Sequence, residues 1–389
     1  MKTAVAGQAV PAGHAPPRHA LSVRHDVWLM GAVAAILGLG LVMVASASVA
    51  LADRQVGQPF YYFWRQVLYV AAGVWLALLT VRLPLSAWRR VGPLLLLASV
   101  VLLGLVLVPG IGREVNGSYR WISLGVFNMQ PSELAKLFVI VYLAGYLVRR
   151  GEEVRTRFSG FVKPMTLLVV VAGLLLLEPD WGATMVLFAT TLGMLFLGGV
   201  PLLRFFGWMA AGLTAMVVTV MLAPYRLQRL TTFMDPWVDP FNTGFQLTQA
   251  LIAVGRGQWL GVGLGASVQK LFYLPEAHTD FLVAVLAEEL GLLGVAALMG
   301  LFGFLVWRAF SLARWAEARG EPFGAYVAYG IGLSFGLQAL INIGVNLGAM
   351  PTKGLTLPLM SYGGSSMLAN CVAVGLLLRL AHELRGGGR

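Results

Sequence analysis

Runs of about 18 to 25 predominantly apolar residues recur along the whole chain, and each is long enough to cross a bilayer as an α-helix. Transmembrane β-strands would be shorter and would alternate apolar with polar residues. Hydrophobic residues make up 58% of the 389 residues and charged residues only 12%, so a soluble protein could not cover its surface with polar groups. The sequence therefore predicts an all-α integral membrane protein with about ten transmembrane helices. The expected spans are residues 27–52, 61–81, 91–109, 131–148, 163–178, 181–199, 205–223, 280–307, 325–345 and 365–381.

The distribution of charge predicts the orientation of these helices. An even number of spans places both termini on one side of the membrane, and most of the 28 basic residues fall on that side. The positive-inside rule then predicts that both termini are cytoplasmic. The net charge of +11 is explained by basic cytoplasmic loops, so we expect no nucleic-acid partner.

We expect one membrane domain over residues 27–381. A disordered cytoplasmic tail, residues 1–26, precedes it, and a short cytoplasmic tail, residues 382–389, follows it. One large extracytoplasmic loop, residues 224–279, joins the seventh and eighth spans. The chain has a single cysteine, Cys371, so it cannot form an internal disulfide.

The large loop is predicted to be structured. Its stretch Gly244–Gly257 has the apolar content of a half-buried or interfacial helix. The glycine run Gly261–Gly265 has no preceding strand, so we interpret it as flexible backbone that lets the loop fold back on the membrane, and not as a dinucleotide-binding loop. Asp235 and Asp239 each precede a proline, which favours turns capped by the side chain, but both are rival catalytic carboxylates.

The first candidate site lies at the start of the fourth span. Pro131 suits the first turn of a helix, and the spacing of Glu133 and Lys136 places both on one face at shallow depth. Ionisable groups in that setting are costly and are functional candidates, although an ion pair that only closes the bundle would leave the same pattern. Arg120, beside Trp121, is either an interfacial anchor or a donor to an anionic headgroup.

The second candidate site lies where the large loop meets the eighth span. Asp280 is either the N-cap of that helix or a general base whose pKa is raised at the lip of an apolar pocket; we favour the base. His278 is another candidate base, although a loop histidine at the interface is more often solvated. Glu288 and Glu289 lie about 12 Å deeper at 1.5 Å per residue, where helix packing or a polar cavity floor is as plausible as catalysis.

Two further cations are expected at the outer face, Arg65 just inside the second span and Lys353 in PTKGLTLPLMSYGGSS. Cations beside carboxylates at a membrane-facing cleft suit a lipid-linked substrate that carries phosphate. The chain has no H-E-x-x-H, no Cys/His cluster and no G-x-S-x-G, which argues against a metalloprotease and a serine hydrolase. These residues alone leave open an enzyme acting on a lipid-linked substrate, a transporter and a scaffold.

Several long stretches resemble the SEDS (shape, elongation, division and sporulation) family. They are RWISLGVFNMQPSELAK, LEPDWGATMVLF, the segment from DPFNTGF to LAEELG, and PTKGLTLPLMSYGGSS, in this order between Val27 and Leu380. Of these, PTKGLTLPLMSYGGSS and LPEAHTDF are more similar to the cell-division members than to the elongation members. The resemblance implies a SEDS fold and a peptidoglycan glycosyltransferase that polymerises lipid II at the division septum, in the bacterial inner membrane with its active site facing the periplasm.

The resemblance also implies residue roles. Asp280 lies in the family's HTDF motif and would be the catalytic aspartate. Many members carry a basic residue just before the Gln-Pro pair, where this chain has Asn128 and Met129. With Lys353 added for its charge, the expected substrate-binding residues are Arg120, Glu133, Lys136, Arg65 and Lys353. Secondary candidates are Asp239, His278 and Glu289.

On this hypothesis, Asp280 removes the proton from the 4-hydroxyl of the acceptor N-acetylglucosamine. That oxygen attacks C1 of the donor N-acetylmuramic acid and inverts it to a β-1,4 link. Undecaprenyl diphosphate leaves, its charge offset by Arg120, Lys136 and either Arg65 or a divalent cation (Mg²⁺ or Mn²⁺). The expected partners are lipid II, a class B penicillin-binding protein transpeptidase of the FtsI type, and other divisome membrane proteins. The alternatives are a lipid II flippase and a division scaffold.

Overall fold

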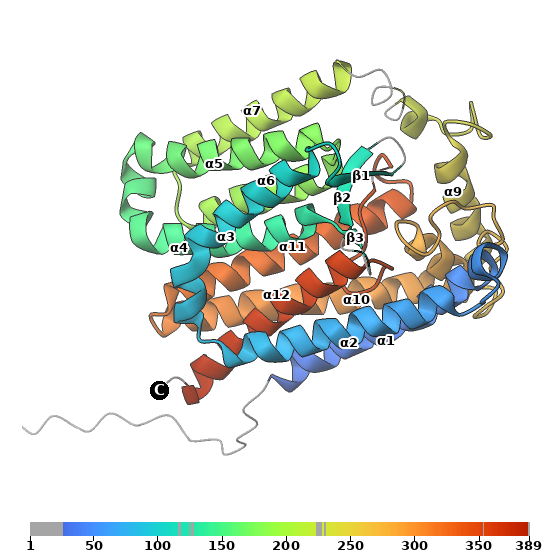
Figure 1. Cartoon of the computed structure of the whole chain (residues 1–389), viewed down its shortest axis with the longest axis horizontal. Helices are drawn as coiled ribbons and strands as arrows, with labels where there is room; N and C mark the ends of the chain where they lie inside the picture. The colour runs from blue at the N-terminus through green and yellow to red at the C-terminus, as the bar shows by residue number, and fades with distance from the viewer. Residues whose placement is uncertain are drawn as a thin grey trace, which may run out of the picture.

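The computed structural model describes residues 26–115, 118–123, 125, 128–222, 228, 231–352 and 354–387. The long helices lie side by side in one bundle (Figure 1). The start of α1 (Val27–Val56) and the end of α12 (Gly364–His382) lie at the left end of the bundle in Figure 1, whereas the strands and α9 (Phe245–Gly257) lie toward the right. The N-terminal tail expected at residues 1–25 falls outside the described residues.

An apolar helix coincides with each of the ten predicted spans. Between α1 and α12 these are α2 (Tyr61–Arg82), α3 (Leu85–Val106), α4 (Pro131–Thr156), α5 (Phe158–Leu177), α6 (Trp181–Leu197), α7 (Leu202–Met221), α10 (Leu282–Ala318) and α11 (Pro322–Asn346). Within the described ranges, nine helices are long and apolar enough to cross a membrane, and α6, with 17 residues, is shorter. The predicted all-α, multi-pass membrane fold is confirmed.

Burial divides these helices into an inner and an outer group. α4, α11 and α12 are mostly buried, whereas α7 has no buried residue in its described range. The inner helices also carry buried polar side chains, including Lys136 on α4 and Gln338 and Asn342 on α11. Because burial of a polar group is costly unless it is hydrogen-bonded, the centre of the bundle is held together by polar contacts as well as by apolar packing.

The boundaries of both predicted tails differ in the structure, because the folded part includes Asp26 and extends to Gly387. Asp26 belongs to the folded domain, because its carboxylate accepts from Leu29 N at the start of α1 (3.2 Å) and pairs with Arg308 Nε (2.7 Å). At the other end, a π-helical turn, Glu383–Gly387, follows α12. Glu383 accepts from Arg379 and from the backbone N–H of Leu85, which ties this turn to α3.

A three-stranded antiparallel sheet precedes α4, and the sequence patterns did not predict it. Its strands are β1 (Gly112–Val115), β2 (Ser118–Ser123) and β3 (Asn128–Met129), in the order β1-β2-β3. The sheet is tied to α12, since Ser365 Oγ accepts from Gln130 N (2.8 Å) and donates to Asn128 O (3.3 Å). It therefore fixes Arg120, at the middle of β2, relative to the helices.

The large loop folds back at its glycines, as expected, but the surface it meets is a break in α10. α10 is broken at Gly291, whose φ is +66°. The loop enters this break, where Val262 N and Gly263 N donate to Glu288 O (2.9 Å) and Glu289 O (3.1 Å). A Cβ at Gly261 would lie 2.1 Å from Glu289 O, so only glycine permits this approach.

The side chains of Glu288 and Glu289 hold the same loop. Glu288 is fully buried and accepts from Arg256 Nη1 (2.8 Å) and from the Ser267 hydroxyl. Glu289 accepts from Lys270 Nζ (2.7 Å) and from Ser46 on α1. Because both carboxylates are used in this way, the structure favours the helix-packing interpretation of this pair over catalysis.

Candidate active site

The turn before α10 positions Asp280 through its backbone. Asp280 O accepts from Asn342 Nδ2 (3.0 Å) and Asn346 Nδ2 (2.9 Å), two side chains one turn apart on α11. The first turn of α10 is capped by Asn346, whose Oδ1 accepts from Ala284 N (3.0 Å). Phe281 occupies the N-cap position, so the N-cap interpretation of Asp280 is wrong. The Asp280 carboxylate therefore makes no capping hydrogen bond to α10.

That carboxylate meets Arg120 above a glycine. A Cβ added to Gly354 would lie 3.3 Å from Asp280 Oδ2 and 3.9 Å from Arg120 Nη1. The two charged groups therefore approach one point from the turn before α10 and from β2, and a side chain at position 354 would come into contact with both. The structure brings together an acid and a cation that are 160 residues apart in the sequence.

The surroundings of Asp280 suit a proton acceptor. Burial, together with the nearby Glu276 and Asp180 carboxylates, raises the pKa of its carboxyl to about 7, although Arg120 opposes them. A general base is most effective when its pKa lies near the working pH. Asp280 can thus both hold and release a proton near neutrality.

Arg120 is held from its other side by a turn between α5 and α6. Its Nε donates to Glu178 O (3.1 Å) and its Nη2 to Pro179 O (2.6 Å). These bonds use two edges of the guanidinium and direct Nη1 toward Gly354. An arginine fixed in this way presents a charged donor without having to be ordered when a ligand arrives.

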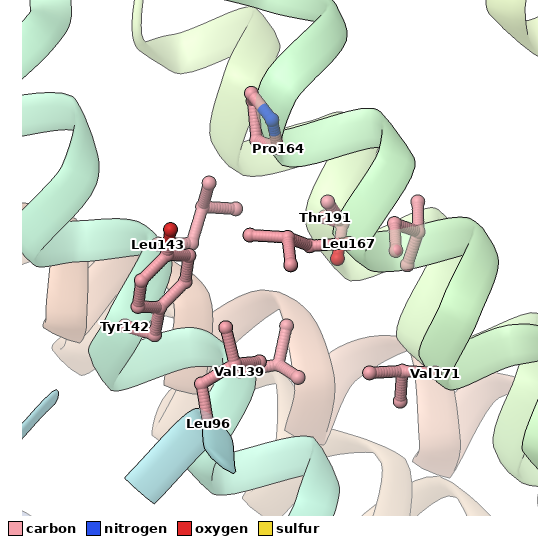
Figure 2. Close-up of a pocket in the computed structure, with 9 residues that line it drawn as sticks. Leu96, Val139, Tyr142, Leu143, Pro164, Leu167, Val171 and Thr191 are labelled. Atoms are coloured by element: carbon pink, nitrogen blue, oxygen red, sulfur yellow. The ribbon is translucent and has the colours of Figure 1, made fainter. Parts of the chain in front are cut away.

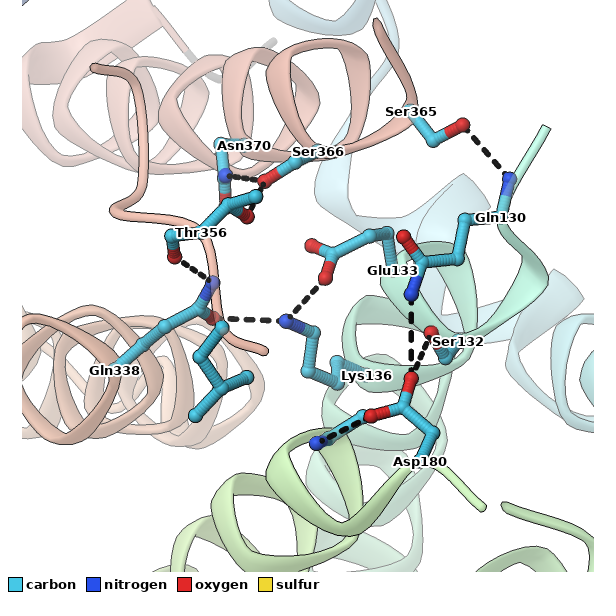
Figure 3. Close-up of polar contacts among 12 residues, drawn as sticks. Gln130, Ser132, Glu133, Lys136, Asp180, Gln338, Thr356, Ser365, Ser366 and Asn370 are labelled. Atoms are coloured by element: carbon cyan, nitrogen blue, oxygen red, sulfur yellow. Dashed lines mark hydrogen bonds and ion pairs between the residues drawn. The ribbon is translucent and has the colours of Figure 1, made fainter. Parts of the chain in front are cut away.

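Glu133 and Lys136 form a buried ion pair on α4 (Figure 3). Lys136 Nζ lies 2.9 Å from Glu133 Oε1 and 2.8 Å from Gln338 Oε1, and the lysine side chain is 6% exposed. Gln338 Nε2 in turn donates to Thr356 O (2.9 Å). The pair therefore supports the segment that carries Gly354, and the second oxygen of Glu133 has no partner among the described residues.

Asp180 joins the start of α4 to the start of α6 (Figure 3). It caps α6 by accepting from Ala183 N (3.0 Å), and its other oxygen accepts from Ser132 Oγ (3.0 Å) and Gln130 Nε2 (3.2 Å). The turn that holds Arg120 is thereby locked to the helix that carries Lys136. Both candidate cations thus belong to one connected polar framework.

His278 and Arg65 lie in an aromatic cluster beside Asp280. The buried His278 ring lies 4.9 Å from the ring centroid of Tyr62 and 5.4 Å from that of Tyr362. Burial lowers the pKa of His278, so its neutral form is favoured, and it is not the solvated residue that we expected. Arg65 Nη1 donates to Tyr61 OH (2.9 Å) on the same helix.

The remaining sequence candidates fall outside this framework. Asp239 accepts hydrogen bonds from Thr243 and Asn242 within the loop. These bonds hold the pKa of its carboxyl below the usual range. Asp235 accepts from Trp237 N (3.2 Å), so both aspartates are turn residues, as one of our two interpretations had it. Lys353 lies outside the described residues.

A family model described as "Cell cycle protein", which covers FtsW, RodA and SpoVE, matches residues 27–386. This chain belongs to that family. The "probable peptidoglycan glycosyltransferase FtsW" of Nitrosococcus halophilus is 58% identical to it over 92% of this chain and 93% of the relative. The protein of the same description from Pseudomonas fluorescens is 54% identical over 92% and 88%. The predicted SEDS membership is confirmed.

Solved structures agree in fold. A chain from a peptidoglycan synthase complex, described as coordinating polymerisation and crosslinking, is 33% identical with a TM-score of 0.77, over 94% of this chain and 99% of that one. The rod shape determining protein RodA of Thermus thermophilus is 32% identical with a TM-score of 0.69 and the same coverage. The family fold therefore extends over nearly the whole chain.

Sequence reasoning missed the residues that hold the site together. Gln338, Asn342 and Asn346 recur at four-residue intervals in an apolar span, which places them on one helix face. Amide side chains on one face of a membrane helix are expensive unless they are bonded. That spacing could have identified the α11 face as the support of Asp280 before the structure was known.

Glu178 is a second buried acid of the site that the sequence analysis did not select. Its side chain is fully buried, and neither carboxyl oxygen has a hydrogen-bond partner within the described chain. Burial, and secondarily Asp180, raises the pKa of Glu178 to about 9, although Arg120 opposes this. Glu178 is therefore neutral at pH 7, beside a cation that it would otherwise attract.

Replacing Glu178 with glutamine should reduce the loss of folding stability that the protein undergoes as pH rises. Because the pKa of this acid is higher in the folded protein than in the unfolded chain, its contribution to stability falls as pH rises from about 4.5 to about 9, by about 1.4 kcal/mol per pH unit. Glu178→Gln removes this loss, so its melting temperature should exceed that of the wild type increasingly from pH 5 to pH 9. The exposed Glu152→Gln is the control, and parallel melting curves for Glu178→Gln and the wild type would contradict the assignment.

The described residues do not form a divalent-cation site from protein ligands alone. In the part of the chain that the structure describes, no three His, Cys, Asp or Glu side chains cluster closely enough to hold a metal ion. Mg²⁺ is often held by one or two carboxylates together with substrate phosphates. The divalent cation therefore stays a proposal in which the substrate supplies most of the ligands.

A small apolar pocket lies among α3, α4, α5 and α6 and is lined by residues such as Leu96, Val139 and Val171 (Figure 2). Its volume of about 10 Å³ matches one water molecule. It is a packing gap, and it offers no room for a sugar or a prenyl chain.

Proposed function

We propose that this chain is a peptidoglycan glycosyltransferase that polymerises lipid II into β-1,4-linked glycan strands at the division septum and releases undecaprenyl diphosphate. The observation that carries the proposal is that the Asp280 carboxylate and the Arg120 guanidinium both lie within 4 Å of the position that a Gly354 side chain would occupy. The curated relatives described as probable peptidoglycan glycosyltransferases support it.

In this mechanism Asp280 is the general base. It accepts the proton of the acceptor 4-hydroxyl while that oxygen forms a bond to C1 of the donor sugar. The bond from C1 to the diphosphate oxygen breaks, the electron pair leaves with undecaprenyl diphosphate, and the configuration at C1 inverts. The raised pKa of Asp280 supports this role, because the carboxylate is basic enough to take the proton near neutral pH.

Arg120 stabilises the leaving group. Its guanidinium is fixed by Glu178 O and Pro179 O, so it faces the developing negative charge with little reorganisation. Lys136 contributes positive charge from the buried pair with Glu133, and Glu133 orients it. Arg65, held by Tyr61, is proposed to add positive charge at the leaving diphosphate, as an alternative to a divalent cation. Lys353 is proposed as a further substrate-binding cation.

The rate of polymerisation should rise with pH through the pKa of Asp280. Protonated Asp280 cannot accept a proton, so activity should be low below pH 6, half-maximal near pH 7 and level above about pH 8. The measurement is the initial rate on purified lipid II in detergent between pH 5.5 and 8.5. A flat profile over this range would contradict the assignment of Asp280 as the base.

The product distinguishes this function from its alternatives. Long glycan strands formed from lipid II in detergent, where no bilayer exists, require a polymerase, whereas a flippase or a scaffold would form none. The assay is run with and without a class B penicillin-binding protein, the proposed partner, and with and without a chelator. Failure to form glycan under all four conditions would overturn the proposal.

The proposed partner and orientation have separate support. A structural relative comes from a complex that coordinates polymerisation and crosslinking, which fits a transpeptidase of the FtsI type beside this chain, among other divisome membrane proteins. We propose that both termini are cytoplasmic and that the Asp280 end of the bundle faces the periplasm, in line with the distribution of basic residues.

A further inference from the structure

A basic groove lies at the end of the bundle opposite to Asp280. Arg89 and Arg90, in the first turns of α3, and Arg149, near the end of α4, line a cavity of about 450 Å³ together with Ser86 and Pro93. All five side chains are exposed. In Figure 1 this end of α3 and α4 lies on the same side as the end of α12.

The Arg149 guanidinium lies against Gly145, one turn earlier on α4, in space that a larger side chain at that position would occupy. A Cβ at Gly145 would lie 3.1 Å from Arg149 Nη1 and 3.9 Å from Arg89 O. Arg149 therefore folds back along α4 into the space between the two helices, toward Arg89. The arginines of the two helices converge in this groove, although each could have extended separately into solvent.

No acid neutralises these three arginines within the described chain. The six ion pairs of the described residues include none of them, and Glu153, on the next turn of α4, pairs with Arg150 instead. Three like charges in one groove repel one another. The arrangement is therefore best stabilised by an anion from outside the chain.

An apolar stripe continues from the groove along α3. Leu94, Leu97 and Val101 are between 50% and 66% exposed, and they follow Arg90 on a helix that faces away from the bundle centre. Residues three and four apart share a helix face, so these side chains form one strip along the membrane. A ligand with a phosphate head and a hydrocarbon chain matches the groove and the strip together.

We propose that this groove binds an anionic phospholipid of the cytoplasmic leaflet, with the phosphate between Arg89, Arg90 and Arg149 and an acyl chain along Leu94, Leu97 and Val101. Basic pockets between helices on the cytoplasmic side are suited to such headgroups. Arginine favours phosphate because its guanidinium offers two parallel donors. The site is independent of the proposed function, since it contains none of the residues assigned to catalysis.

The test measures binding of phosphatidylglycerol, labelled on its acyl chain, to the full-length protein in neutral detergent. Saturable binding is expected for the wild type. Each arginine is worth about fivefold in affinity, so R89Q/R90Q/R149Q should bind on the order of 100-fold more weakly. The matched control R82Q/K163Q/R314Q removes three exposed charges elsewhere and should stay within about twofold of the wild type. An equal loss in both triple variants would overturn the proposal, because the effect would then be one of overall charge.

A second variant keeps every charge and guards against misfolding of the triple variant. Arg149→Lys keeps the charge but removes the two parallel donors of the guanidinium, so phosphatidylglycerol affinity should fall about fivefold while net charge is unchanged. Unaltered affinity in this variant would overturn the proposed geometry. Labelled phosphatidylcholine should bind weakly to all variants. Displacement of the lipid by inorganic phosphate at equal concentration, or by an oligoglutamate peptide, would overturn the lipid assignment in favour of a soluble anion or an acidic protein segment.

Discussion

Asp280→Asn should abolish polymerisation of purified lipid II. The substitution keeps the size of the side chain and its polar character but removes the proton acceptor, which lowers the rate by about 10² to 10⁴-fold for a general base. The measurement is the yield of glycan strands from lipid II in detergent over a fixed time. Because the pKa of Asp280 is about 7, the loss should be largest at pH 8, where the wild-type carboxylate is deprotonated.

The variant should remain folded. Asn342 and Asn346 hold Asp280 through its backbone oxygen, and that contact does not depend on the side chain. The raised pKa of Asp280 costs the wild type stability as pH rises from about 3.8 to about 7. The melting temperature of the variant at pH 8 should therefore equal or exceed that of the wild type. Asp239→Asn, in an exposed turn, is the matched control and should retain activity. If Asp280→Asn forms glycan at the wild-type rate, Asp280 is not the base.

Lys136→Met should destabilise the protein by about 3 to 5 kcal/mol, because it leaves the Glu133 carboxyl buried without its cation. The same change frees Gln338, which bonds Lys136 on one side and Thr356 O on the other. The Gly354 segment should then loosen, and polymerisation should be lost with it. Thermal unfolding in detergent measures the first effect and the lipid II assay measures the second.

A double variant separates the structural role of Lys136 from its proposed role at the diphosphate. Glu133→Leu with Lys136→Met removes both charges, and replacing a buried ion pair by apolar residues is often neutral for stability. This variant should recover most of the melting temperature of the wild type. If the double variant also recovers polymerisation, Lys136 does not act on the substrate.

The sequence by itself determined the number and position of the membrane helices. Ten apolar stretches became ten helices, because a helix satisfies its own backbone hydrogen bonds in lipid regardless of its neighbours. The same reasoning found the half-buried helix Phe245–Gly257 and the fold-back at Gly261. These features depend on local composition and on backbone freedom, which are properties of the residues themselves.

Some properties of the candidate site could be predicted without the structure, and others could not. A carboxylate at the helix entry and cations on the outer side were visible in the sequence, and the SEDS resemblance selected Asp280 and Arg120 among them. The meeting of these two side chains above Gly354 was not visible, since it depends on a small sheet whose strands have only two to six residues. Strands this short do not produce a recognisable alternation of apolar and polar residues in the sequence, so the sheet could not be predicted.

Only the tertiary structure decided what each charged residue does. Glu133, Glu178, Asp280 and Glu288 are all acids in apolar surroundings, yet one is paired with lysine, one is neutral, one lies near an arginine beside Gly354 and one anchors a loop. A local sequence predicts that such a group must find a partner, because an unpaired charge in a membrane protein is costly. Glu133 finds Lys136 one turn along the same helix, but the neighbours of the other three acids come from segments that are distant in the chain. Burial beside those neighbours determines whether the acid carries a proton.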